Sequence, residues 1–241
     1  MLEAGMWGLV GGVALLVGAG IGLRWTIRES VIGLVMAFGS GVLISAVAFE
    51  LAEEAFEADG GAVVTAGLLL GALTFYAGDA VIDRRGGGDR KRSGNEQAAG
   101  SASALVLGAL LDGIPESVAV GASLLGGGAV GLTVVVAVFL SNIPEGLAAS
   151  TGLRKAGRSV RWILALWTAV AVVSGIAAAL GFALLGGVDS GAVSVTQAFA
   201  AGAILTMLAD TMMPEALSKG GNSAGLVTSL GFVLAFLLSH G

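Results

Sequence analysis

Apolar residues fill most of the chain in runs of roughly 20 residues, and short polar stretches separate these runs. A helix of that length crosses the hydrocarbon core of a bilayer, so each run is expected to span a membrane. We expect helices over about 5–23, 31–55, 61–83, 101–125, 129–150, 162–186, 190–216 and 221–240. The pattern therefore predicts an all-α membrane protein, a single bundle of eight transmembrane helices formed by residues 1–241.

One polar interruption is much longer than the others. Residues 84–100 read RRGGGDRKRSGNEQAAG, which is rich in glycine and basic residues and has no apolar periodicity. Such a composition is typical of a mobile linker. The first apolar run follows Glu3 without a basic segment before it, so we interpret it as a retained helix rather than a signal peptide.

Composition agrees with a membrane protein and excludes thiol chemistry. Only 12% of the residues are charged, whereas about 25% is usual in soluble proteins. The chain has no cysteine, so disulfides, thiolate metal sites and cysteine nucleophiles are absent. The 41 glycines suit close helix packing in a bilayer and are compatible with a homodimer.

The basic residues are distributed asymmetrically. With eight crossings, all 12 lysines and arginines fall in the loops on one side, and the side that holds both termini has none. Because cytoplasmic loops carry an excess of Lys and Arg, we expect a multi-pass protein of the cell membrane with a cytoplasmic linker and both termini outside.

Two predicted helices share the tripeptide I-P-E in the middle of an apolar run, within LLDGIPESVAVG (110–121) and LSNIPEGLAAS (140–150). A proline inside a helix leaves a carbonyl without its hydrogen bond and kinks the helix. At membrane depth, freed backbone is tolerated where it lines a cavity. The two segments therefore predict proline-kinked helices around a polar cavity.

The carboxylates of these helices suggest a cation. Asp112 and Glu116 share one helical face, as do Ser141, Asn142 and Glu145 on the second helix. Each acid costs about 2.5–3.5 kcal/mol near the centre of a membrane helix, and three together would repel one another. A divalent cation with oxygen ligands removes the repulsion. In the alternative interpretation, each glutamate is protonated and hydrogen-bonds a neighbouring helix.

Other acids mark the ends of a possible cation pathway. We assign Glu50 to the outer end and Asp79 and Asp210 to the cytoplasmic end, where a negative mouth would concentrate cations. Further acids are interpreted as solvated helix ends: Glu57, Asp59, Asp83 and Glu215.

Together with GSGVLISAVAFELAEEAF (39–56), GAILTMLADTMMPEAL (202–217) and the long linker, the paired I-P-E helices resemble the ZIP (Zrt/Irt-like) metal transporters. The resemblance covers nearly the whole chain, and S-N-I-P-E-G is its most specific motif. It implies a metal site bridged by Glu116 and Glu145, with Asp112, Ser141 and Asn142 as further ligands. It also implies uptake toward the cytoplasm by alternating access.

The chain departs from that family at the positions where histidines are common. Asp112, Ser141, Glu50 and Asp210 stand there instead. Carboxylate and carbonyl ligands suit harder ions, so Mn²⁺ and Fe²⁺ are expected to gain relative to Zn²⁺. The metal ion is a transported substrate, and neither an organic cofactor nor a nucleic-acid partner is expected. No G-x-x-x-x-G-K-[ST] motif occurs, which argues against ATP as the energy source.

Two other functions compete with transport. The chain could be a non-transporting metal sensor or structural bundle that has lost the usual histidines. It could also be an intramembrane hydrolase that uses Glu53 and Glu54, although no His or Arg lies near that pair in the sequence. We expect that the chain is not an enzyme.

Overall fold

The computed structural model describes residues 1–241 except 87–88, 91, 94–101, 126–128 and 241, and its described part contains helices and no strands. The α-helices are α1 (Leu2–Arg24), α2 (Glu29–Ala46), α3 (Glu54–Asp59), α4 (Gly61–Asp83), α5 (Ala102–Ser123), α6 (Ala129–Lys155), α7 (Val160–Leu185), α8 (Ser190–Met207), α9 (Met213–Gly220) and α10 (Ala224–His240). The all-α prediction is confirmed.

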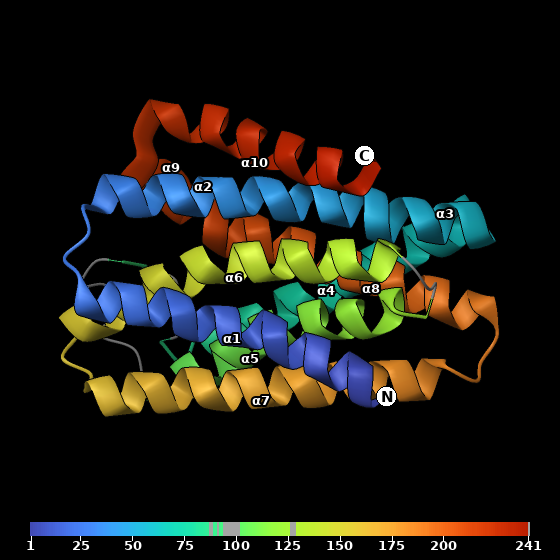
Figure 1. Ribbon diagram of the computed structural model, residues 1–241, viewed down its shortest axis with the longest axis horizontal. Coiled ribbons are helices and arrows are strands. Elements are labelled where there is room, and N and C mark those ends of the chain that lie inside the picture. Colours follow the sequence, from blue (N-terminus) through green and yellow to red (C-terminus); the bar gives the residue numbers. More distant parts are fainter. Residues whose placement is uncertain (87–88, 91, 94–101, 126–128, 241) are drawn as a thin grey trace.

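Seven helical stretches in the described residues are long and apolar enough to cross a membrane. The seventh, Ser190–His240, contains both α8 and α10. The chain turns within it at Gly221, whose φ of +58° is a backbone conformation that glycine adopts without strain. After this turn α10 runs back along α2, so the two termini lie at the same end of the bundle (Figure 1).

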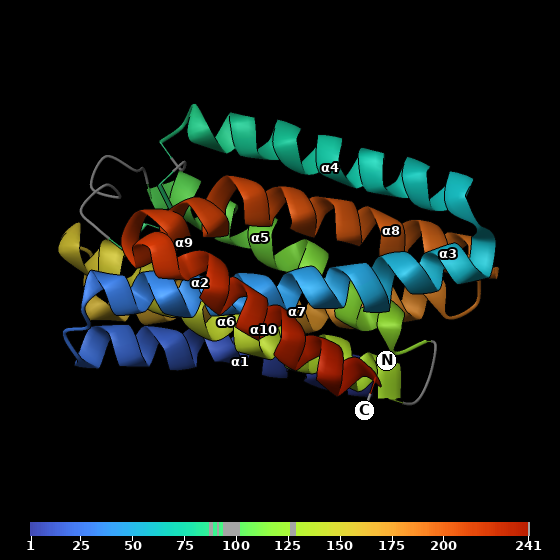
Figure 2. The same ribbon diagram turned by 90° about the horizontal axis from the view of Figure 1, so that it is seen from above.

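The helices pack in neighbouring pairs that are distant in sequence. α1 lies against α6 and α7, α10 lies against α2, and α4 lies against α8 (Figures 1 and 2). The outer side of α4 exposes Leu69, Leu70 and Leu73. Such a surface is unfavourable in water and suits contact with lipid. The chain is therefore a multi-pass membrane protein.

Glycines allow α1 and α6 to approach with backbone against backbone. A methyl group on Gly18 would lie 2.0 Å from the carbonyl oxygen of Ile143, and one on Gly146 would lie 2.2 Å from that of Leu15. Both distances are far below van der Waals contact. The glycine of the P-E-G motif thus serves helix packing, and this contact fixes the stretch of α6 that carries Glu145.

Two short π-helical segments interrupt the predicted helices. η1 (Val47–Glu53) continues α2 into α3, and η3 (Leu208–Met212) joins α8 to α9. The run length predicted continuous helices there and did not indicate either segment. Each contains one acid that we assigned to the pathway, Glu50 in η1 and Asp210 in η3. By contrast, α5 and α6 continue as α-helices through Pro115 and Pro144.

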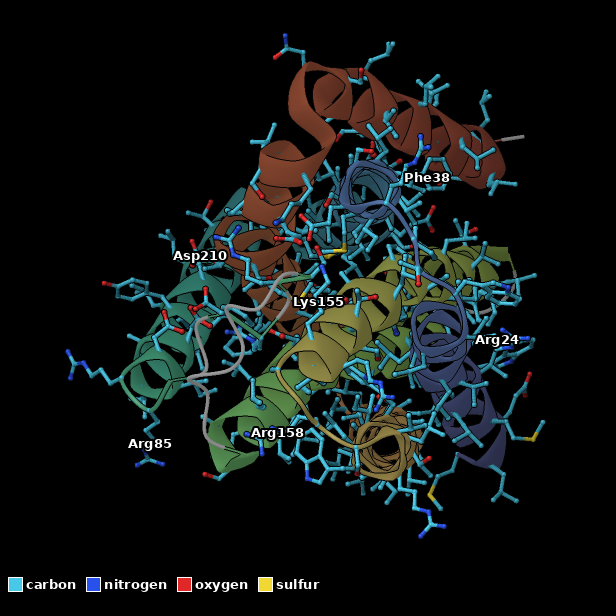
Figure 3. All side chains as sticks on the ribbon, turned by 90° about the vertical axis from the view of Figure 1, so that its left-hand side faces the viewer. Arg24, Phe38, Arg85, Lys155, Arg158 and Asp210 are labelled. Carbon is cyan, nitrogen blue, oxygen red and sulfur yellow. The ribbon has the colours of Figure 1, made fainter. Side chains whose placement is uncertain are left out.

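The basic residues gather at one end of the bundle, opposite the termini. Arg24, Arg85, Lys155 and Arg158 lie at this end, which faces the viewer in Figure 3. Here Glu29 accepts hydrogen bonds from Lys155 at 2.6 Å and from Lys219 at 2.9 Å. We call this the basic end.

Candidate functional site

The five side chains expected to bind a cation are all buried on α5 and α6. Asp112 and Glu116 are each 1% exposed, and Ser141, Asn142 and Glu145 are at most 4% exposed. Burial of three acids is costly unless each finds a compensating partner. The partner of Asp112 is known from the structure.

Arg90, from the linker, forms a bidentate ion pair with Asp112. Its Nε donates to Oδ2 at 2.8 Å and its Nη2 donates to Oδ1 at 2.9 Å. Arg90 is only 4% exposed, although it belongs to a segment that we expected to be a mobile linker. The described part of the linker therefore departs from that expectation at Arg90.

The same guanidinium reaches acids of α4. Its Nη2 lies 2.6 Å from Oδ1 of Asp79, and its Nη1 lies 3.9 Å from Oδ1 of Asp83. Burial alone would lower the pKa of Arg90, but the negative charges of Asp112 and Asp79 and their hydrogen bonds outweigh it and raise that pKa. Arg90 is a buried positive charge that links α4 to α5 through these ion pairs.

A small cavity brings the α5 and α6 carboxylates toward one space. Arg90, Asp112 and Glu145 line it together with Trp167 and aliphatic residues. Its volume of about 10 Å³ holds about one water molecule. On the wall, Nε1 of Trp167 donates to Oγ of Ser150 at 2.7 Å. Asp112 and Glu145 therefore line one small cavity, and Glu116 is not part of its lining.

The other two polar residues of α6 have local partners. Nδ2 of Asn142 donates to the carbonyl oxygen of Gly11 on α1 at 3.0 Å, and Oγ of Ser141 donates to that of Val138 at 3.0 Å. With its nitrogen held by α1, Asn142 has its side-chain oxygen to offer a cation.

A second contact attaches the linker to the bundle. Ser93 donates from its backbone N–H to Oε1 of Glu215 at 2.8 Å and also from its hydroxyl group, while Nη1 of Arg92 lies 3.4 Å from Oε2. Ser93 and Glu215 are both fully buried. The interpretation of Glu215 as a solvated helix end was wrong, because the linker covers it and supplies its hydrogen-bond donors.

The two predicted mouths have different surroundings. At the basic end, Asp79, Asp83 and Asp210 line a groove of about 450 Å³ together with Tyr76. This groove places Asp210 near the acids that contact Arg90.

At the opposite end, Glu50 is buried and accepts a hydrogen bond from Ser239 on α10. Nearby, Nε2 of Gln197 donates to Oε2 of Glu54 at 3.0 Å, and Glu54 lines an open groove of about 500 Å³. Asp59, which we interpreted as solvated, accepts a hydrogen bond of 2.5 Å from Ser194.

Within the described residues, no group of three or more His, Cys, Asp or Glu side chains has the spacing of a metal site. An arginine instead provides the positive charge beside Asp112. Arg90 and Ser93 could not be identified from the sequence, since they lie in a stretch without periodicity. The sequence signal for such a contact is that the linker is rich in basic residues while the neighbouring predicted helices contain acids.

No known protein-family profile matches the chain. It is similar to a protein of Arabidopsis thaliana named "Putative zinc transporter", with 28% identity over 194 residues. The match covers 79% of this chain and 31% of the plant protein, so the chain corresponds to about a third of its relative's length.

Proposed function

We propose that this multi-pass protein carries divalent metal cations across a membrane through a site between α5 and α6. The observation that carries the proposal is the burial of Asp112, Glu116 and Glu145 on two neighbouring apolar helices that both contain an I-P-E sequence. Burial of three acids in a bilayer costs free energy, and ionisable residues inside transmembrane segments commonly line ion pathways. The similarity to a protein named as a zinc transporter supports the same function.

In this proposal Glu116 and Glu145 bind the ion, and Asp112, Asn142 and Ser141 complete its coordination. All five offer oxygen atoms, which suit Mn²⁺ and Fe²⁺ and are also accepted by Zn²⁺. The cavity shared by Asp112 and Glu145 supports a site that draws ligands from both helices. The ion would enter near Glu50 and leave past Asp79 and Asp210.

The proposed topology has eight crossings, with α8 and α10 counted separately. The basic end then faces the cytoplasm and both termini lie outside, as the positive-inside rule requires. Transport toward the cytoplasm is passive or driven by an ion gradient. These features fit the architecture of the ZIP family.

Metal flux into proteoliposomes tests the proposal. We expect the intact chain to take up Zn²⁺ and Mn²⁺ and a competition assay to show no strict preference for Zn²⁺. Glu145→Gln and Glu116→Gln should each reduce the rate at low metal concentration by at least about a hundredfold, because even indirect partners of metal ligands contribute 10–100-fold.

The exposed Glu53 provides a matched control with the same loss of charge. Glu53→Gln should leave the flux unchanged. Wild-type flux in the Glu145→Gln and Glu116→Gln proteins would refute the site. Metal binding without flux would favour a sensor, and hydrolysis that is lost in Glu53→Gln would favour an enzyme.

A further inference from the structure

Arg90 uses the atoms of Asp112 that a metal ion would need. Both carboxylate oxygens of Asp112 accept hydrogen bonds from the guanidinium, at 2.8 and 2.9 Å. A divalent cation bound to those oxygens would lie about 2.0–2.6 Å away from them. Both cations would then stand within a few ångströms of each other in a site of low dielectric constant, where their repulsion is strong.

The space around the ion pair is also too small for both. The cavity between Arg90, Asp112 and Glu145 measures about 10 Å³, which holds about one water molecule. A metal ion with even part of its hydration shell needs more room. Occupation of Asp112 by Arg90 and by a metal is therefore mutually exclusive.

The position of Arg90 depends on a contact outside this site. Three residues further along the linker, the N–H and hydroxyl groups of Ser93 bind the buried Glu215 of α9. Connecting segments normally lie on the surface, and arginine is almost never buried unless it is paired. These two contacts hold Arg90 and Ser93 in buried positions.

From these observations we infer that Arg90 is a tethered cationic plug that competes with the transported metal for Asp112 and closes the site toward the basic end. The inference rests on the proposed transport function and adds its regulation. Metal can reach Asp112 only after Arg90 has withdrawn, and the contact of Ser93 with Glu215 sets how often it withdraws. The structure represents the closed, self-inhibited state.

The test compares Zn²⁺ and Mn²⁺ uptake into proteoliposomes by the intact chain and three variants. Arg90→Gln removes the plug's charge. Glu215→Gln weakens the remote contact without changing any residue assigned to the cation. Arg84→Gln is the matched control, since it removes one positive charge from an exposed position in the same linker.

We expect Arg90→Gln to lower the metal concentration for half-maximal uptake by about tenfold, which corresponds to a plug that leaves the site open about a tenth of the time. Glu215→Gln should shift it in the same direction by a smaller factor, and Arg84→Gln should not shift it. If Arg90→Gln or Glu215→Gln takes up metal and the unmodified chain does not, that result also supports the plug.

The plug is refuted if the unmodified chain transports metal and neither Glu215→Gln nor a folded Arg90→Gln changes the metal concentration for half-maximal uptake. It is also refuted if a folded Arg90→Gln takes up less metal than the unmodified chain. Size-exclusion chromatography reports whether Arg90→Gln is folded, and where it is not, Glu215→Gln alone decides. Absence of uptake by every variant with both metals would refute the transport function itself and the inhibition with it.

Discussion

Substitution of Gly18 by alanine probes the contact that fixes α6. The new methyl carbon would lie 2.0 Å from the carbonyl oxygen of Ile143, where ordinary contact begins at 3.4 Å. α1 and α6 must therefore separate by more than an ångström at this point. The separation occurs two residues from Glu145, so it disturbs both packing and the candidate site.

The magnitude follows from the two opposing effects of alanine. Overpacking of a tight contact costs about 1–3 kcal/mol, whereas alanine in place of glycine in a helix interior favours the helix by about 1 kcal/mol. Gly20 lies on the same helix with nothing within 4 Å of its added methyl group. Gly20→Ala should thus gain the propensity term without the clash, and because both variants share that gain they should differ by the overpacking cost of about 1–3 kcal/mol.

Thermal unfolding in detergent measures this difference, with intrinsic tryptophan fluorescence as the signal. We expect Gly18→Ala to melt several degrees below Gly20→Ala, which should melt at or above the unmodified chain. Metal uptake by Gly18→Ala should also fall. Equal melting temperatures for the two variants would show that α1 and α6 do not meet at Gly18 and would refute the packing argument.

Two further predictions concern hydrogen bonds and surface charge. Trp167→Phe removes the buried donor to Ser150 and should lower the free energy of unfolding by about 1–3 kcal/mol, measured by denaturant titration followed by circular dichroism; no loss would contradict that bond. Glu29→Gln breaks the exposed pairs with Lys155 and Lys219 and should cost less than about 1 kcal/mol, an effect that 1 M salt abolishes in the same titration. A larger, salt-independent cost would refute a purely superficial role for Glu29.

The helices themselves were largely predictable from hydrophobic run length. The helix expected over 61–83 has the bounds of α4, and the runs expected over 162–186 and 190–216 begin close to α7 and α8. Side-chain caps mark those two starts, at Ser159 and Asp189. The π-helical segments could not be predicted, because a wider helical turn inside an apolar run does not change the length of that run.

The candidate site was predictable only as far as local patterns reach. Polar residues within apolar runs identified Asp112, Glu116 and Glu145, and all three are buried. The roles of these carboxylates stay predictions. The partnership of Arg90 with Asp112 spans 22 residues and depends on how the linker folds back, which no periodicity encodes.

The internal arginine has a consequence for how the protein is made. Many metal-binding proteins need their ion to fold, and chelators unfold them. Here the polypeptide supplies its own counter-charge to Asp112 and Asp79 during assembly. A newly synthesised copy can therefore fold around these two acids without a bound metal ion.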